Sequence, residues 1–179
     1  MKGDQLERAL HSADPDVRRQ AVYRMSLRPQ GTPLTQILEA LSDSDWRVRR
    51  EAISLAAQTR EPGALVDALL SRVVDTDNIG LRNAAIEVLG LIGQGKADQF
   101  ARASEQANDA GRKFLIEAMG KTRDPRMIDN LAGLLRGDDT NSAAAAVEAL
   151  VCIGGTRAES LLRDCLSAPA LFLRISIVE

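Results

Sequence analysis

The sequence is poor in the residues that build most catalytic centres and most β-sheets. Aromatic residues make up 3% of its 179 residues, and it contains one histidine and two cysteines. So few aromatic side chains among many alanines and leucines favour closely packed helices, because sandwiches and barrels need β-branched and aromatic alternation. The single histidine, His11, excludes a histidine-based metal cluster. We expect His11 simply to end the first helix, and we expect no cofactor and no enzymatic activity.

Charge and hydropathy narrow the class of protein further. The net charge is −2, whereas proteins that bind nucleic acid usually carry a clear basic excess. No run approaches about 20 uninterrupted apolar residues, so no membrane span is expected, and the first residues lack the apolar core of a signal peptide. Cys152 and Cys165 do not suggest a disulfide framework, and we expect both to be buried thiols. A cytoplasmic location follows as the simplest expectation.

An internal repeat organises the whole chain. Its clearest copy is Asp-Ser-Asp-Trp-Arg-Val-Arg-Arg-Glu-Ala-Ile at 43–53, in which Ala52 is a small residue with equivalents elsewhere. The equivalent positions are Ala21, Ala52, Ala85, Leu115, Ala146 and Ile177, which are 31, 33, 30, 31 and 31 residues apart. The residue after this position is β-branched in every copy, and the residue fifteen before it is apolar in every copy. A fixed period of this length is typical of a solenoid.

Each repeat is predicted to fold as two helices. Apolar residues four apart mark the first helix, as at Leu6 and Leu10, and the small position with its neighbours marks one face of the second. Asp or Asn stands seven residues before the small position in five copies, where it would cap the second helix. The predicted pairs cover residues 4–28, 33–59, 63–92, 96–122, 125–153 and 157–179, within about 2–4 residues at each boundary.

Arginine recurs three residues before the small position, at Arg18, Arg49, Arg82, Arg112 and Arg174. One interpretation is a ladder that binds anions. The stronger interpretation is structural, because an arginine on the packed side of a helix can bind the acidic turn of its own or the neighbouring repeat.

Three segments carry a resemblance to a known family: Asp14-Pro-Asp-Val-Arg-Arg-Gln-Ala-Val, the copy at 43–53, and Leu81-Arg-Asn-Ala-Ala-Ile-Glu-Val-Leu-Gly-Leu-Ile-Gly93. They resemble HEAT repeats, in the short bacterial form named after phycobilisome lyases. The resemblance covers essentially the whole chain as one domain, 1–179. It implies an all-α, right-handed solenoid of about six antiparallel helix pairs, with second helices lining the concave face, and it implies a scaffold that binds other proteins.

The last copy departs from the pattern. It lacks a capping residue at Ala170, has Ile177 at the small position and stops at Glu179, so the last pair is predicted to be truncated. Terminal solenoid repeats normally need a polar outer face. We therefore expect this end to meet a longer chain, a partner or a second copy through four apolar residues: Phe172, Leu173, Ile175 and Val178.

The side of the second helices that faces away from the core is the candidate partner-binding surface. Its candidate residues are Arg19, Tyr23, Arg50, Glu51, Ser54, Glu87, Leu91, Lys113, Phe114, Glu117 and Glu148. Trp46, the only tryptophan, is a candidate anchor at the edge, although packing over the seam between two repeats is the simpler expectation.

The leading functional hypothesis is a non-enzymatic scaffold or adaptor that binds another protein through this concave face. An alternative, suggested only by the resemblance, is a bilin lyase or a protein that handles such a chromophore. A third is a DNA glycosylase built on similar repeats. Such an enzyme needs a basic channel, and the glutamates at positions 87, 117 and 148 count against one.

Overall fold

The computed structural model describes residues 3–28, 31–137 and 139–166, and these residues form helices and short connections without a strand. In chain order the helices are α1 (Gly3–Leu10), α2 (Pro15–Ser26), α3 (Leu34–Leu41), α4 (Trp46–Ala56), α5 (Gly63–Val74), α6 (Ile79–Ile92), α7 (Ala97–Gln106), α8 (Asp109–Thr122), the 3₁₀ helix η1 (Pro125–Met127), α9 (Ile128–Leu134), α10 (Thr140–Ile153) and α11 (Thr156–Leu166). Within the described ranges, none of these helices has the length and apolar character needed to cross a bilayer.

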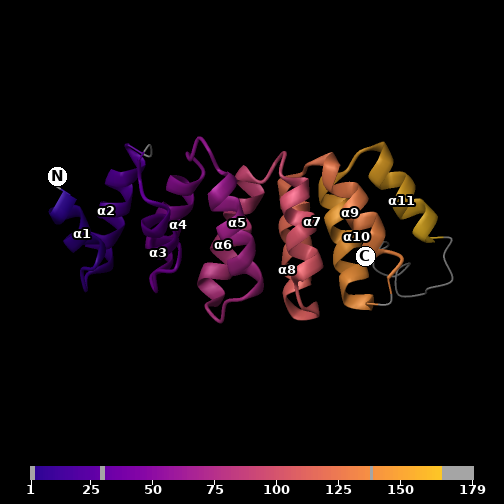
Figure 1. Cartoon of the computed structure of the whole chain (residues 1–179), viewed down its shortest axis with the longest axis horizontal. Coiled ribbons are helices and arrows are strands. Elements are labelled where there is room, and N and C mark those ends of the chain that lie inside the picture. The colour runs from indigo at the N-terminus through magenta and orange to yellow at the C-terminus, as the bar shows by residue number, and fades with distance from the viewer. Residues whose placement is uncertain (1–2, 29–30, 138, 167–179) are drawn as a thin grey trace.

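The helices stand side by side along the long axis of the molecule (Figure 1). α1 packs on α2, α3 on α4, α5 on α6, α7 on α8 and α9 on α10, and α11 follows at the far end. The all-α solenoid predicted from the sequence is confirmed. The second helix expected in the last repeat, with Phe172, Leu173, Ile175 and Val178, lies outside the described residues.

Each second helix begins at the polar residue that the repeat predicts. Asp14, Asp45, Asn78, Asn108 and Asp139 precede α2, α4, α6, α8 and α10, and each side chain accepts a hydrogen bond from a backbone N–H of the first turn. The distances run from 2.7 Å at Asn108 to 3.0 Å at Asp139. These bonds satisfy donors that an α-helix leaves free at its start. The predicted capping is therefore confirmed.

The core follows the columns of the repeat. The small-position residues of the described repeats (Ala21, Ala52, Ala85, Leu115 and Ala146) are at most 1% exposed. A small residue at this position lets neighbouring helices approach closely in four of the described repeats. The fourth repeat takes leucine at this position, and Leu115 is completely buried.

The second helices make one continuous layer. α2 packs on α4, α4 on α6, α6 on α8 and α8 on α10, with the least extensive packing between α4 and α6. The first helices touch one another less, and their clearest contacts join α5 to α7 and α9 to α11. A single helix pair cannot bury its apolar stripe alone, so this layer holds the array together.

Candidate partner-binding face

The second-helix face is the exposed side of α2, α4, α6, α8 and α10. It carries all of the candidate residues named from the sequence: Arg19 and Tyr23 on α2, Trp46, Arg50, Glu51 and Ser54 on α4, Glu87 and Leu91 on α6, Lys113, Phe114 and Glu117 on α8, and Glu148 on α10. Tyr23, Trp46 and Leu91 are 51%, 60% and 59% exposed. These three exposed apolar side chains stand on α2, α4 and α6, so they recur along the array.

Two hollows bring several of these residues together. The α4–α6 hollow is about 430 Å³ in volume. Its lining residues are Trp46, Arg49, Arg50, Ile53, Gly80, Asn83, Ala84 and Glu87. The α8–α10 hollow is about 360 Å³ in volume. Its lining residues are Lys113, Phe114, Glu117, Gly120, Lys121, Ala145, Glu148, Ala149 and Cys152. The remaining candidates line neither hollow: Arg19, Tyr23, Glu51, Ser54 and Leu91.

Phe114 is half-buried, and two cationic side chains lie over its ring. The Arg82 guanidinium carbon is 4.5 Å from the ring centroid and the Lys113 ammonium is 4.8 Å from it. Contacts of this kind contribute about 0.5–1 kcal/mol near a surface. Arg82 Nε is buried and has no hydrogen-bond partner among the described residues. The ring therefore helps to accommodate Arg82, and Phe114 joins α8 to α6 besides contributing to the face.

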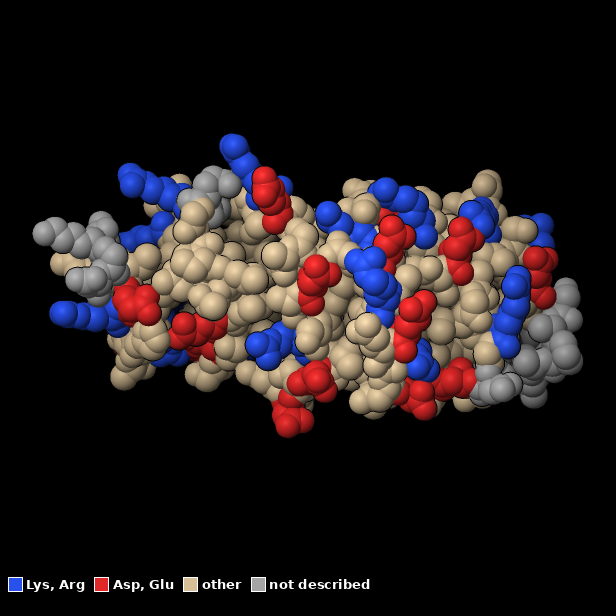
Figure 2. All heavy atoms as spheres, in the orientation of Figure 1, with Lys and Arg blue, Asp and Glu red and all other residues tan. Residues whose placement is uncertain are grey.

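Some charged candidates already have partners on their own helix. Lys121 binds Glu117 at 3.3 Å, and Arg19 lies 3.6 Å from Asp16. Pairs this exposed contribute little to stability and leave both groups accessible. Figure 2 shows charged side chains of both signs interspersed over the side of the molecule in view.

Several residues of the face were not singled out from the sequence. Asn83 lines the α4–α6 hollow, and Ile79 and Val151 are 67% and 60% exposed. Asn83 occupies the same repeat position as Arg50 and Lys113, two residues before the small position. This shared position could have identified Asn83 as a candidate from the sequence.

Two expectations about single residues need correction. Cys152 is exposed, not buried, and lines the α8–α10 hollow. Cys165 is half-buried, and burial raises the pKa of its thiol. Trp46 lies at the seam between α4 and α6, as expected, but most of its side chain remains open to solvent.

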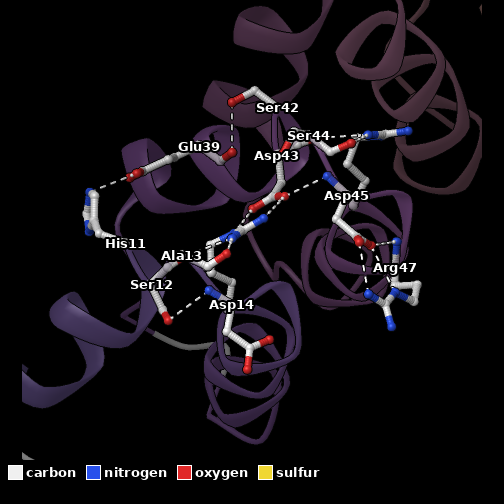
Figure 3. Close-up of polar contacts among 12 residues, drawn as sticks. His11, Ser12, Ala13, Asp14, Glu39, Ser42, Asp43, Ser44, Asp45 and Arg47 are labelled. Carbon is white, nitrogen blue, oxygen red and sulfur yellow. Dashed lines mark hydrogen bonds and ion pairs between the residues drawn. The ribbon is translucent and has the colours of Figure 1, made fainter.

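The arginine column is structural. Arg18 of α2 binds Asp43 of the next repeat through Nε at 2.7 Å and Nη2 at 2.9 Å, and its Nη1 donates to the Ser12 carbonyl at 2.7 Å. Arg49 donates to the carbonyls of Asp43 and Ser44 in the same way. Figure 3 draws the contacts around this turn. Arg18 therefore closes its own turn and joins the first two repeats, and Arg49 closes the turn before α4.

The acidic residues of this turn are held in the ionised form. Burial alone would raise the pKa of Asp43, but hydrogen bonds from Arg18 and from the Asp45 backbone N–H bring it below its usual value. The Arg47 side chain and backbone N–H lower the pKa of Asp45 to about 2. Within residues 3–28, 31–137 and 139–166, no group of three His, Cys, Asp or Glu side chains is placed to share a metal ion.

The comparison with protein families adds one finding. A family model described as HEAT repeats matches residues 32–104, which run from the start of the α3–α4 pair into α7. This part of the chain is similar to HEAT repeats. The matched range includes all of the residues that line the α4–α6 hollow.

Comparison with solved structures finds designed proteins. An engineered protein is 17% identical over 98% of this chain and 93% of its own, with a TM-score of 0.42. A designed armadillo repeat protein is 16% identical over 97% of this chain and 96% of its own, with a TM-score of 0.40. No curated protein matches the sequence significantly.

Proposed function

We propose that the chain is a non-enzymatic scaffold, one HEAT-repeat domain that binds another protein on its second-helix face. The observation that carries the proposal is the recurrence of exposed apolar side chains on this face, at Tyr23, Trp46, Leu91 and Val151, in four different repeats. An interface needs a few such anchors surrounded by polar side chains, and the face has both. The proposal includes the cytoplasmic location and the bacterial repeat subtype expected from the sequence.

Packing supports the choice of face. The second helices contact one another more extensively than the first helices do. The more closely packed layer of a curved array lies on its inner side, so we place the second-helix face on the concave side. An extended concave surface is how repeat proteins commonly hold a partner.

Affinity capture from an extract of the source cells tests the proposal. The bait is compared with a triple variant of the face, Tyr23→Ala with Glu87→Ala and Leu91→Ala, whose side chains are exposed. A matched triple variant changes exposed residues of first helices, Thr35→Ala with Arg72→Ala and Glu105→Ala. Circular dichroism should show that both variants keep the wild-type helix content.

A protein recovered with the wild type and with the first-helix variant, but lost with the face variant, would support the proposal. Its dissociation constant should rise at least tenfold in the face variant, because anchors of this kind each contribute about 1 kcal/mol or more. A partner that binds both variants as it binds the wild type would contradict the choice of face.

A further inference from the structure

The α4–α6 hollow is held open by Arg49. Its guanidinium is fixed by the carbonyls of Asp43 at 2.7 Å and Ser44 at 3.0 Å, and it lies against the backbone of Gly80. A Cβ atom at Gly80 would lie 2.9 Å from the Arg49 guanidinium carbon. The glycine therefore lets a charged group stand between α4 and α6, the two second helices that pack least extensively.

Both walls of this hollow offer polar side chains that the protein itself does not use. Arg50 on α4 and both Asn83 and Glu87 on α6 are exposed, and their side chains make no hydrogen bond or ion pair with any described residue. The two charges are opposite and lie on opposite walls. Between α6 and α8, by contrast, the Arg82 side chain lies against the ring of Phe114.

Apolar groups complete the hollow. Trp46 lines it with 60% of its side chain exposed, and the much less exposed Ile53 and Ala84 line it as well. A rigid aromatic side chain beside a small apolar floor suits one aliphatic or aromatic side chain of a partner.

We propose that this hollow takes an extended segment of a partner protein in which an apolar residue lies between an acidic residue and a basic one. Arg50 binds the carboxylate, Glu87 binds the cation, and Trp46 covers the apolar side chain. The Asn83 amide, which both donates and accepts, binds a peptide group of the segment. The inference rests on the proposed function and specifies the partner for this part of the face.

Spacing sets the position of the charges. Packed helices lie about 8–10 Å apart, and an extended chain advances about 3.3 Å per residue. The acidic and basic residues of the segment are therefore about three positions apart. A wholly acidic or wholly basic segment would leave one wall of the hollow facing a like charge, which costs affinity.

Three synthetic peptides of equal length with blocked termini test the inference. The mixed peptide carries glutamate, leucine and lysine in the proposed spacing among serines, and the other two carry only glutamate or only lysine at the charged positions. Trp46 is the only tryptophan of the chain, so its fluorescence reports binding in this hollow. Anisotropy of a dye on the peptide reports binding anywhere on the protein.

The mixed peptide should bind at least about fivefold more tightly than either other peptide and should shift the Trp46 emission to shorter wavelength. Glu87→Lys should remove this advantage and make the glutamate-only peptide the tightest ligand. Arg50→Glu should do the reverse and favour the lysine-only peptide. Charge reversal on first helices, at Glu105→Lys or Arg72→Glu, should leave the order of affinities unchanged.

The inference would be overturned if neither Glu87→Lys nor Arg50→Glu changed the order of peptide affinities. It would also be overturned if anisotropy showed binding while the Trp46 fluorescence did not change. These outcomes are separate from a failure of the proposed function. A natural partner lost with the Tyr23, Glu87 and Leu91 variant would still support a scaffold, even if the mixed peptide failed to bind.

Discussion

Arg18 and Asp43 form a bidentate ion pair that joins the first two repeats. Arg18 Nε lies 2.7 Å from Asp43 Oδ2, and Arg18 Nη2 lies 2.9 Å from Oδ1. The two side chains are 14% and 11% exposed, so water screens the pair poorly. The pair links α2 of the first repeat to the turn after α3 of the second.

Arg18→Ala should destabilise the protein by about 2 kcal/mol. The substitution removes the hydrogen bonds that Arg18 donates to the partly buried Asp43 carboxylate and Ser12 carbonyl. The midpoint of urea unfolding, followed by circular dichroism, measures the effect. Lys121→Ala is the control, since its pair with Glu117 is about half exposed and should change stability by less than about 0.5 kcal/mol. Equal shifts in the two variants would show that burial does not decide the contribution of these pairs.

Asp43 should also make the stability depend on pH in the acid range. Its pKa in the folded protein is below the usual value, which is about 3.9 for an unfolded chain. The ionised carboxylate therefore stabilises the fold above about pH 4, and this stabilisation is lost as the pH falls through the lowered pKa. Asp43→Asn should be less stable than the wild type at neutral pH, and the difference should shrink on acidification. A difference that stays constant down to about pH 2.5 would contradict this assignment.

The repeat columns predicted the solenoid because each column has one physical task. A buried small residue, a β-branched neighbour and a capping Asp or Asn recur only when the same helix pair recurs, so the helices and caps could be placed from Ala52 and Asp45 outward. Cys152 was wrongly predicted to be buried, although the equivalent positions of other repeats indicate an exposed site. It lies six residues after the small position, as Leu27 and Leu91 do, and all three are exposed.

The contacts between repeats could not be predicted in this way. A period shows which residues are equivalent, but it does not show which side chain of the next repeat each one meets. The ring of Phe114 is covered because Arg82 comes from the preceding repeat, and the α4–α6 hollow exists because Arg49 meets a glycine, Gly80. These features depend on pairs of columns, and a different residue in either column removes them.

Two glycines in helices should respond in opposite directions to alanine. A Cβ atom at Gly120 in α8 would lie 2.8 Å from the Ala149 Cα of α10, and backbone cannot move aside as a flexible side chain can. Gly120→Ala should therefore destabilise the array by about 1–3 kcal/mol. Gly133→Ala in α9, with nothing within 4 Å, should stabilise it by up to about 1 kcal/mol, because alanine favours the helix. Urea unfolding of both variants compares them, and a stable Gly120→Ala protein would mean that α8 and α10 can separate without cost.

His11 should make the attachment of α1 depend on pH near neutrality. Its Nδ1 lies 2.9 Å from the Glu7 carbonyl, and its Nε2 lies 3.0 Å from the Glu39 carboxylate of α3. Both contacts need a proton on the ring nitrogen, so the Glu7 carbonyl, followed by Glu39, raises the pKa of His11. The stabilisation is complete below the unfolded value of about 6.5 and is lost as the pH rises through the raised pKa.

Amide hydrogen exchange in α1, corrected for the intrinsic effect of pH, should therefore slow as the pH is lowered from about 8 to about 6. His11→Asn should abolish this dependence, and exchange in α8 serves as an internal control because it is remote from His11. If α1 of the His11→Asn variant kept the pH dependence of the wild type, another group would have to hold α1 against α3.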